Sequence, residues 1–162
     1  MSGSTLGLIG YLAVLSAQPV PNTGTESEQK RLTPADIAAL PTIEAGAGTS
    51  GVSGIRTTVL AGNPSASSPY TIMLQVPANT RIAAHTHRDT RSAVVMSGTW
   101  HFGYGAKAAG GGTKALGPRS FYTEPANVAH FARTGAEPVV LYISGVGPTD
   151  TQYTAIEDDP RP

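Results

Sequence analysis

Residues 77–98 (PANTRIAAHTHRDTRSAVVMSG) and residues 118–130 (PRSFYTEPANVAH) decide how the rest of this sequence is interpreted. In the first stretch His85 and His87 are two positions apart in a predicted strand, so both side chains point to the same face. His130 closes the second stretch, on a later predicted strand that follows a proline-bearing turn. Neutral imidazole is the commonest metal ligand. Two histidines on one strand face and one from a neighbouring strand can therefore define three corners of a coordination shell.

Short strands dominate the remaining pattern. Eight segments are rich in β-branched or aromatic residues and bounded by Gly, Pro, Asn or Asp, namely residues 55–60, 70–76, 81–87, 92–96, 99–104, 119–124, 128–133 and 138–144. Such spacing, with no long helix, predicts an all-β sandwich, jelly roll or small barrel. One short helix is expected before the strands, because Thr33 suits the N-cap, Pro34 the first helical position, and Pro41 ends it. The tail from Pro148 is expected to be irregular.

The two histidine stretches resemble the two motifs of the cupin family, the first with HxH, an acid and a glycine, the second with a proline and one histidine. The matching residues, in order, are His85, His87, Gly98, Pro125 and His130. The resemblance covers roughly residues 50–147 and implies a small single-domain cupin of type 2, an RmlC-like jelly-roll β-barrel. It also implies that His85, His87 and His130 are metal ligands, the alternative being three core histidines. Iron, manganese, nickel and zinc all suit imidazole, so the identity of the divalent metal stays open.

Position 91, four residues after His87, departs from the family pattern, because Arg91 stands where the acid is expected. At about 5 Å from a dication and an effective dielectric of ~20, its charge would cost roughly 6–7 kcal/mol. Arg91 can turn outward or pair with Asp89 or Glu124, which leaves a three-histidine site. It can instead bind an anionic group of a substrate that also touches the metal. In the third alternative the site has lost its metal and takes an anionic ligand. Arg119, which replaces a glycine of the second motif, affects only a turn.

Arg91, Tyr122 and Glu124 are the candidate catalytic residues. An arginine presents a fork that matches a carboxylate. In its parts the site is similar to the thiol dioxygenases of the cupin superfamily, in which three histidines hold iron and an arginine holds the substrate carboxylate. Tyr122 and Glu124 precede the proline of the second motif and can reach the pocket mouth as proton donor or acceptor; otherwise they are strand-surface residues. Asp89 is either a displaced fourth ligand or a turn acid that caps its own backbone.

A substrate pocket is predicted from the register of a hairpin. Residues 97–98 (Ser-Gly) are expected to form a two-residue turn that pairs the strands before and after it. In that register Trp100, Phe102 and Tyr104 face the barrel interior and line the core or the pocket. His101 faces outward, as a surface or dimer contact, and is not expected to be a ligand.

Composition limits the classes of function. The formal net charge is zero and there is no Lys/Arg-rich run, which argues against nucleic-acid binding. The chain has no cysteine, which excludes disulfides, thiolate ligands and cysteine nucleophiles. The leading hypothesis is a metal-dependent enzyme, similar to a dioxygenase, isomerase or lyase, that acts on a small organic molecule, anionic if Arg91 binds it. The alternative is a cupin that binds a small ligand or acts as a sensor without catalysis, with or without metal.

The N-terminal region is expected to lie outside the domain. Residues 1–32 contain a ten-residue apolar run (6–15) and a polar linker, whereas residues 33–162 form the single cupin domain. The run is too short to span a bilayer, so no stable membrane insertion of the mature domain is expected. It fits a signal peptide, which predicts a periplasmic or secreted protein, or else an arm on a neighbouring subunit, with a cytoplasmic location as the alternative. A homodimer is expected, because open barrels have strand edges to cover.

Overall fold

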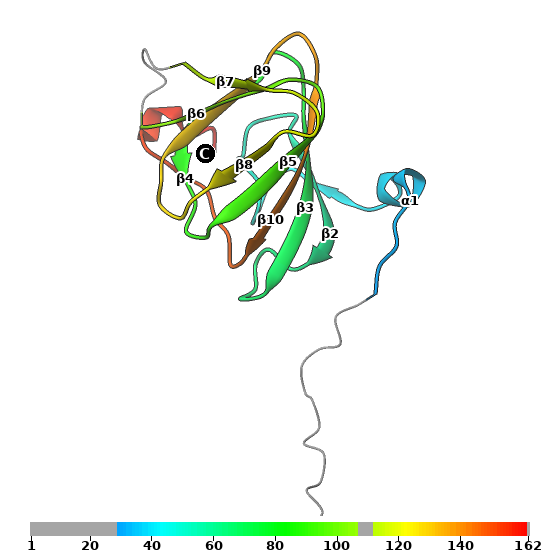
Figure 1. The fold of residues 1–162 in the computed structure, drawn as a ribbon. Helices are drawn as coiled ribbons and strands as arrows, with labels where there is room; N and C mark the ends of the chain where they lie inside the picture. The colour runs from blue at the N-terminus through cyan, green and yellow to red at the C-terminus, as the bar shows by residue number, and fades with distance from the viewer. Residues whose placement is uncertain (1–28, 107–111, 162) are drawn as a thin grey trace, which may run out of the picture.

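Alternation of buried and exposed residues along short strands organises the computed structural model, which describes residues 29–106 and 112–161. The elements in chain order are α1 (Pro34–Ala38), β1 (Thr42–Ile43), β2 (Arg56–Gly62), β3 (Pro69–Val76), β4 (Arg81–Thr86), β5 (Arg91–Ser97), β6 (Trp100–Tyr104), β7 (Lys114–Leu116), β8 (Phe121–Glu124), β9 (His130–Thr134), β10 (Val139–Val146), β11 (Gln152–Tyr153) and a 3-10 helix (Ile156–Asp158). The predicted all-β jelly roll with one short α-helix is confirmed for the described residues (Figure 1).

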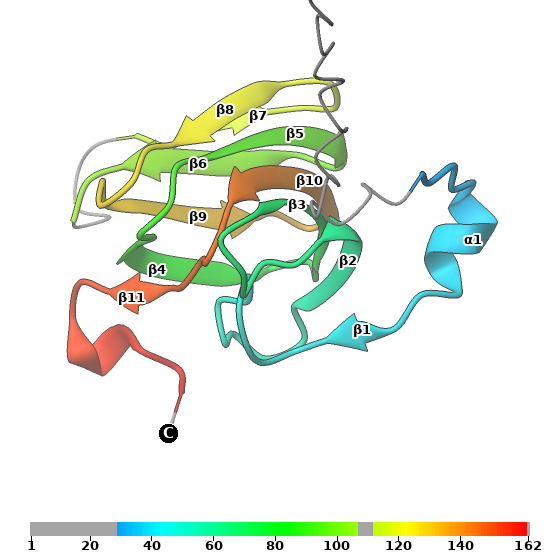
Figure 2. The same cartoon turned by 90° about the horizontal axis from the view of Figure 1, so that it is seen from below.

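The strands form two antiparallel sheets that pack face to face (Figure 2). In the described residues one sheet has the order β1-β2-β3-β10-β5-β8 and the other β11-β4-β9-β6-β7. The inner faces meet in a core in which Ile72, Val95 and Leu141 are completely buried. Burying each such side chain contributes about 1.5–3 kcal/mol. Strand β5 turns every second residue into this core, so Arg91, at its first position, points inward together with Val95.

All eight predicted strands are present, each with ends within about two residues of the prediction, as is usual for strand boundaries. The sequence patterns missed β1, β7 and β11, which are only two or three residues long. The predicted helix start is confirmed, because Thr33 caps α1 and accepts a hydrogen bond from the Asp36 amide. The helix ends at Ala38, before Pro41. The prediction of an irregular tail is partly wrong, since β11 and the 3-10 helix lie within it.

The predicted hairpin at residues 97–98 is wrong. Strand β5 pairs with β10 and β8, whereas β6 pairs with β9 and β7, so the turn carries the chain from one sheet to the other. Gly98 is required there for a different reason: its φ is +74°, and a Cβ would lie 2.2 Å from the Pro138 carbonyl oxygen. Trp100 and Phe102 nevertheless reach the core from the opposite sheet, 2% and 5% exposed.

The predictions for residues 1–28, including the signal peptide, fall outside the described residues. Within the described ranges, no helix has the length and apolar character that crossing a membrane requires.

Candidate metal centre

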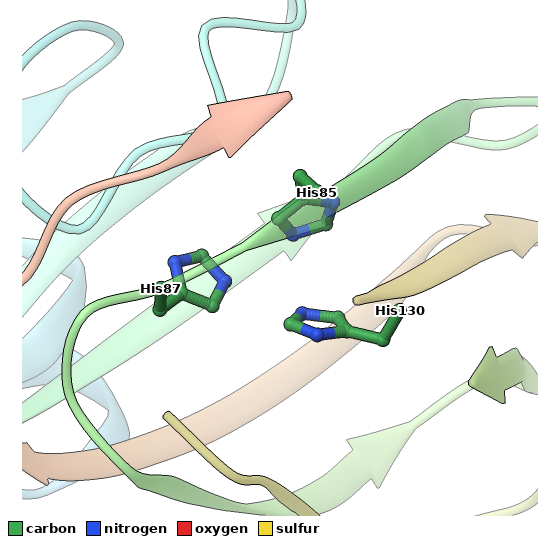
Figure 3. Close-up of side chains that lie close together, drawn as sticks. All are labelled: His85, His87 and His130. Carbon is green, nitrogen blue, oxygen red and sulfur yellow. The ribbon is translucent and has the colours of Figure 1, made fainter. Parts of the chain in front are cut away.

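The three motif histidines converge inside the jelly roll. His85 lies near the end of β4, His87 just beyond it, and His130 at the start of β9, where it is the register partner of His85. One ring nitrogen from each lies within 4.8 Å of the others. All three side chains are buried, with exposures of 5%, 2% and 1%. Figure 3 shows the rings grouped around a common space. The predicted convergence of the two motifs is therefore confirmed.

Backbone carbonyls orient each ring. The Nδ1 contacts are His85 to the Ala83 oxygen at 2.7 Å, His130 to the Val128 oxygen at 3.0 Å, and His87 to the Asp150 oxygen. A carbonyl oxygen only accepts hydrogen bonds, so each Nδ1 carries the proton and donates it. Each Nε2 is left unprotonated, which is the tautomer that binds a metal, with the ring direction fixed by an outer hydrogen bond. The Nε2 of His87 also accepts a contact from Arg91 Nη2.

Burial keeps these imidazoles neutral. It lowers the pKa of His85 from its usual 6.5 to about 4, helped by the nearby His130. Burial, and then the positive charge of Arg91, lower the pKa of His87 to about 2. Burial also lowers the pKa of His130. The three rings therefore offer lone pairs, not protons, at neutral pH.

The site residues fit a divalent metal. The buried His130 Nε2 has no hydrogen-bond partner among the described residues, and an unsatisfied buried polar atom is costly. Three neutral nitrogen ligands are the donor set that zinc and other first-row divalent ions accept, and three protein ligands leave a position open. The donor set and the unpartnered nitrogen thus both favour an ion at the centre of the cluster.

Arg91 is buried beside the histidines and paired with an acid. Its side chain is 5% exposed, and its Nε donates to Glu124 Oε2 at 2.6 Å. The Arg91 Nη2 contacts the same oxygen and also His87 Nε2. Burial by itself would raise the pKa of Glu124, but the Arg91 charge holds it at about 2, so the carboxylate is ionised. Of the sequence alternatives, pairing with Glu124 is the one observed, and the outward orientation is wrong.

Asp89 does not join the cluster. Its Oδ2 accepts a hydrogen bond from the Tyr70 hydroxyl at 2.7 Å, so the observed partner of Asp89 is Tyr70 and not a histidine. Among the described residues the group whose ligand atoms all lie within 4.8 Å comprises the three histidines and includes neither Asp89 nor Glu124.

The histidine cluster lies within the part of the chain that matches a known domain family. Residues 42–150 match the family described as the ChrR cupin-like domain. The chain belongs to this cupin family. The cupin resemblance of the two histidine motifs is thereby confirmed, together with its RmlC-like jelly roll. No curated protein matches the chain.

Solved structures share the cupin fold at low sequence identity. The polyketide cyclase RemF from Streptomyces resistomycificus has a TM-score of 0.65 and 16% identity, over 82% of this chain and 90% of that chain. An RmlC-like cupin from Shewanella frigidimarina has a TM-score of 0.54 and 16% identity, over 83% and 98% of the two chains. A structure from a study of the DMSP lyases RdDddP and RnDddQII has a TM-score of 0.56 and 19% identity. The match covers 70% of this chain but only 60% of that chain. Such identities establish the fold alone.

The cupin barrel encloses a small cavity of about 30 Å³ at the histidines. At about 10–15 Å³ for each water, it has room for an ion and one or two small ligand atoms. Trp100 and Phe102 form part of its wall, with the centre of the Phe102 ring 5.4 Å from that of the His130 ring. Tyr104 does not line it: the prediction that this ring faces the interior is wrong. Tyr104 ends β6 with 54% of its surface exposed, and its hydroxyl donates to the Thr123 carbonyl at 2.6 Å.

Tyr122 and Glu124 both face this cavity of the cupin. The sequence left two alternatives, residues that reach the pocket mouth or residues on the strand surface. The strand-surface alternative is wrong, because Tyr122 and Glu124 are only 7% and 4% exposed. The Tyr122 hydroxyl and the Trp100 indole nitrogen lie near each other, yet neither forms a hydrogen bond of good geometry within the described residues. Burial, and then the Glu124 charge, raise the pKa of Tyr122 well above its usual value. The phenol therefore keeps its proton.

Sequence reasoning missed the groups that orient the histidines. They are main-chain carbonyls, so side-chain chemistry gives no signal for them. Two of the three, those of Ala83 and Val128, come from the residue two positions before the histidine concerned. The third, from Asp150, lies 63 positions from His87 in the sequence and depends on the path of the C-terminal segment.

Proposed function

We propose that this cupin binds one divalent metal ion through Nε2 of His85, His87 and His130 and is an enzyme that acts on a small organic molecule. The observation that carries the proposal is the convergence of three buried, neutral imidazoles, each with Nδ1 donating to a main-chain carbonyl. A bound iron, manganese, nickel or zinc ion would supply Lewis-acid polarisation of a substrate oxygen.

The residues around the cluster suggest how the chain itself takes part. Tyr122 holds a proton in a position facing the cavity and can donate it to a substrate oxygen. Glu124 is ionised and can accept a proton or a hydrogen bond. The Arg91 charge is already balanced by Glu124, so an anionic substrate is not needed to neutralise it. A clamp between Arg91 and a substrate carboxylate is accordingly the weaker form of the proposal.

The cavity volume limits the substrate. With about 30 Å³ inside the barrel, only one end of an organic molecule can reach the histidines, and the rest lies toward the mouth. Oxygenase, isomerase and lyase reactions can each take place at one end of an organic molecule, at a group that carries an oxygen atom. The structural neighbours named as a cyclase and a lyase support such chemistry only through their shared fold.

Metal analysis of the purified protein tests the site directly. We expect about one equivalent of divalent metal per chain, lost in His85→Ala and in His130→Ala and retained in the control His101→Ala, whose ring is outside the cluster. Absence of metal from protein that has been refolded or dialysed with each of the four ions would contradict the proposal. Equal metal content in the wild type and the two ligand variants would contradict it as well.

The second candidate is a cupin that binds metal or a small ligand as a sensor, without turnover. The small volume of the cavity favours it, since little space is left for a substrate beside an ion. Incubating metal-loaded protein with small hydroxy, keto and unsaturated acids separates the two. Product formation or oxygen uptake that disappears in Tyr122→Phe supports the enzyme; ligand-dependent stabilisation without any product supports the sensor.

Association and location stay predictions. A homodimer is tested by light scattering on the purified protein. A periplasmic or secreted location, as opposed to a cytoplasmic one, is tested by fractionating cells that express the full chain and by determining its mature N-terminus.

A further inference from the structure

The carboxylate of Glu124 lies where a fourth ligand would extend the histidine cluster. Its Oε2 is 3.6 Å from His87 Nε2 and 3.8 Å from His130 Nε2. Two ligands that bind one ion at about 2.1 Å in a tetrahedral arrangement are separated by about 3.4 Å. The Glu124 oxygen is therefore close to the spacing at which it can share an ion with these two nitrogens.

Glu124 comes from a different strand than the family acid. Arg91 occupies the position of that acid on β5, and Glu124 is its direct register partner on the neighbouring strand β8. Both side chains are buried, 5% and 4% exposed, and they contact each other through the Arg91 Nε and Nη2 atoms. A carboxylate thus lies directly across the strand pair from the family position, and both side chains line the cavity at the histidines.

We propose that Glu124 is a fourth protein ligand of the metal centre and that Arg91 is the positioning residue that holds its carboxylate. This inference rests on the proposed three-histidine site. At position 91 an arginine replaces the family acid, and the Glu124 carboxylate supplies the missing negative charge. The dication therefore faces a balanced ion pair instead of an isolated guanidinium. The contact of Arg91 Nη2 with His87 Nε2 uses the lone pair that the ion needs. Arg91 must therefore give up that contact on metal binding, while its Nε can keep Glu124 in place.

The first test replaces only the charge of the carboxylate, in Glu124→Gln. Zinc affinity is measured by competition with a chromophoric chelator, and ligand geometry by the visible absorption of cobalt-loaded protein. We expect zinc affinity to fall by about 10–100-fold or more and the cobalt spectrum to change. Glu137→Gln, in an exposed acid outside the cavity, is the matched control and should leave both unchanged. Affinity within about twofold of wild type, together with an unaltered cobalt spectrum, would overturn the role of Glu124.

A charge exchange covers the case in which Glu124→Gln does not fold. In Arg91→Glu/Glu124→Arg the pair still opposes across β5 and β8, and the carboxylate now occupies the family position. We expect this double variant to bind zinc within about tenfold of wild type, and both proteins to bind it more tightly than Arg91→Met/Glu124→Gln, which has a carboxylate at neither position. If wild type and Arg91→Met/Glu124→Gln bind zinc equally, Glu124 is not a ligand. If the wild-type protein itself binds no zinc, or His85→Ala binds it equally well, the three-histidine proposal fails instead.

Discussion

Removing the guanidinium of Arg91 should destabilise the metal-free protein far more than removing both charges of its pair. Arg91 and Glu124 are 5% and 4% exposed, and the Arg91 charge is what holds the pKa of Glu124 at about 2 against burial. Arg91→Met leaves a buried carboxylate without a partner, which costs about 3–5 kcal/mol. That is a large part of the 5–15 kcal/mol that typically stabilises a domain.

The double variant Arg91→Met/Glu124→Gln carries neither charge and should unfold within about 1–2 kcal/mol of wild type. The four proteins then form a double-mutant cycle. With about 3–5 kcal/mol for each single variant and about 1–2 kcal/mol for the double variant, the coupling free energy is about 4–9 kcal/mol. Urea unfolding followed by circular dichroism, in the presence of a chelator, supplies each free energy. Single-variant costs that simply add would refute the view that the two charges depend on each other.

The pH dependence of the same cycle has a defined sign. In wild type the pKa of Glu124 is lowered from 4.5 to about 2, so its stabilising contribution is present above pH 4.5 and is lost as pH falls toward 2. Arg91→Met removes the largest effect that opposes burial, so the pKa of Glu124 should rise above its unfolded value. The variant then regains stability relative to wild type as pH falls from 8 to 5. A destabilisation that is constant across this range would contradict the proposed cause.

Three further predictions concern other parts of the barrel. Because burial disfavours the charged form of His85, the metal-free protein should lose about 3 kcal/mol of stability as pH falls from 6.5 to about 4. Unfolding of wild type and His85→Gln across that range would measure this loss. Tyr122→Phe removes an unsatisfied buried hydroxyl, so it should leave stability unchanged or raised by about 1 kcal/mol in urea unfolding, and keep metal content. Gly98→Ala should cost at least about 1–3 kcal/mol in thermal unfolding, because of its positive φ and the close Pro138 oxygen, whereas Gly135→Ala, with open space around it, should be nearly neutral.

The strands and the metal cluster could be predicted from sequence because both depend on local periodicity. Every second residue of a strand shares a face, which brought His85 and His87 together. The resemblance of the two motifs to the cupin family implied that His130 joins them, and the structure pairs it with His85. Strand pairing could not be predicted in the same way. Residues 97–98 have the composition of a hairpin turn, but β5 pairs with β10 and β8 while β6 pairs with β9 and β7, so the turn joins two sheets instead. Whether β5 pairs with β6 or with β10 and β8 cannot be inferred from the local sequence around the turn.

Tyr104 illustrates a second limit of periodicity. Alternation along β6 assigns it to the same face as Trp100 and Phe102, yet it is the last residue of the strand. At a strand end the neighbouring sheet no longer covers the side chain, and the hydroxyl finds a main-chain acceptor on Thr123 of β8. A polar group on an aromatic ring gains more from such a contact at the rim than from an apolar interior, where it would lack a partner.

The pairing of Arg91 with Glu124 illustrates why one position of a motif is a poor guide to the chemistry of a site. Inside a closed sheet, residues in direct register on neighbouring strands face the same interior, so either of them can present a charge to the same place. A substitution of acid by arginine removes the carboxylate from one strand, but a carboxylate on the next strand restores the pairing. What the interior requires is that buried charges be balanced. That condition applies to the register pair, and it can be recognised from sequence only once the strand pairing is known.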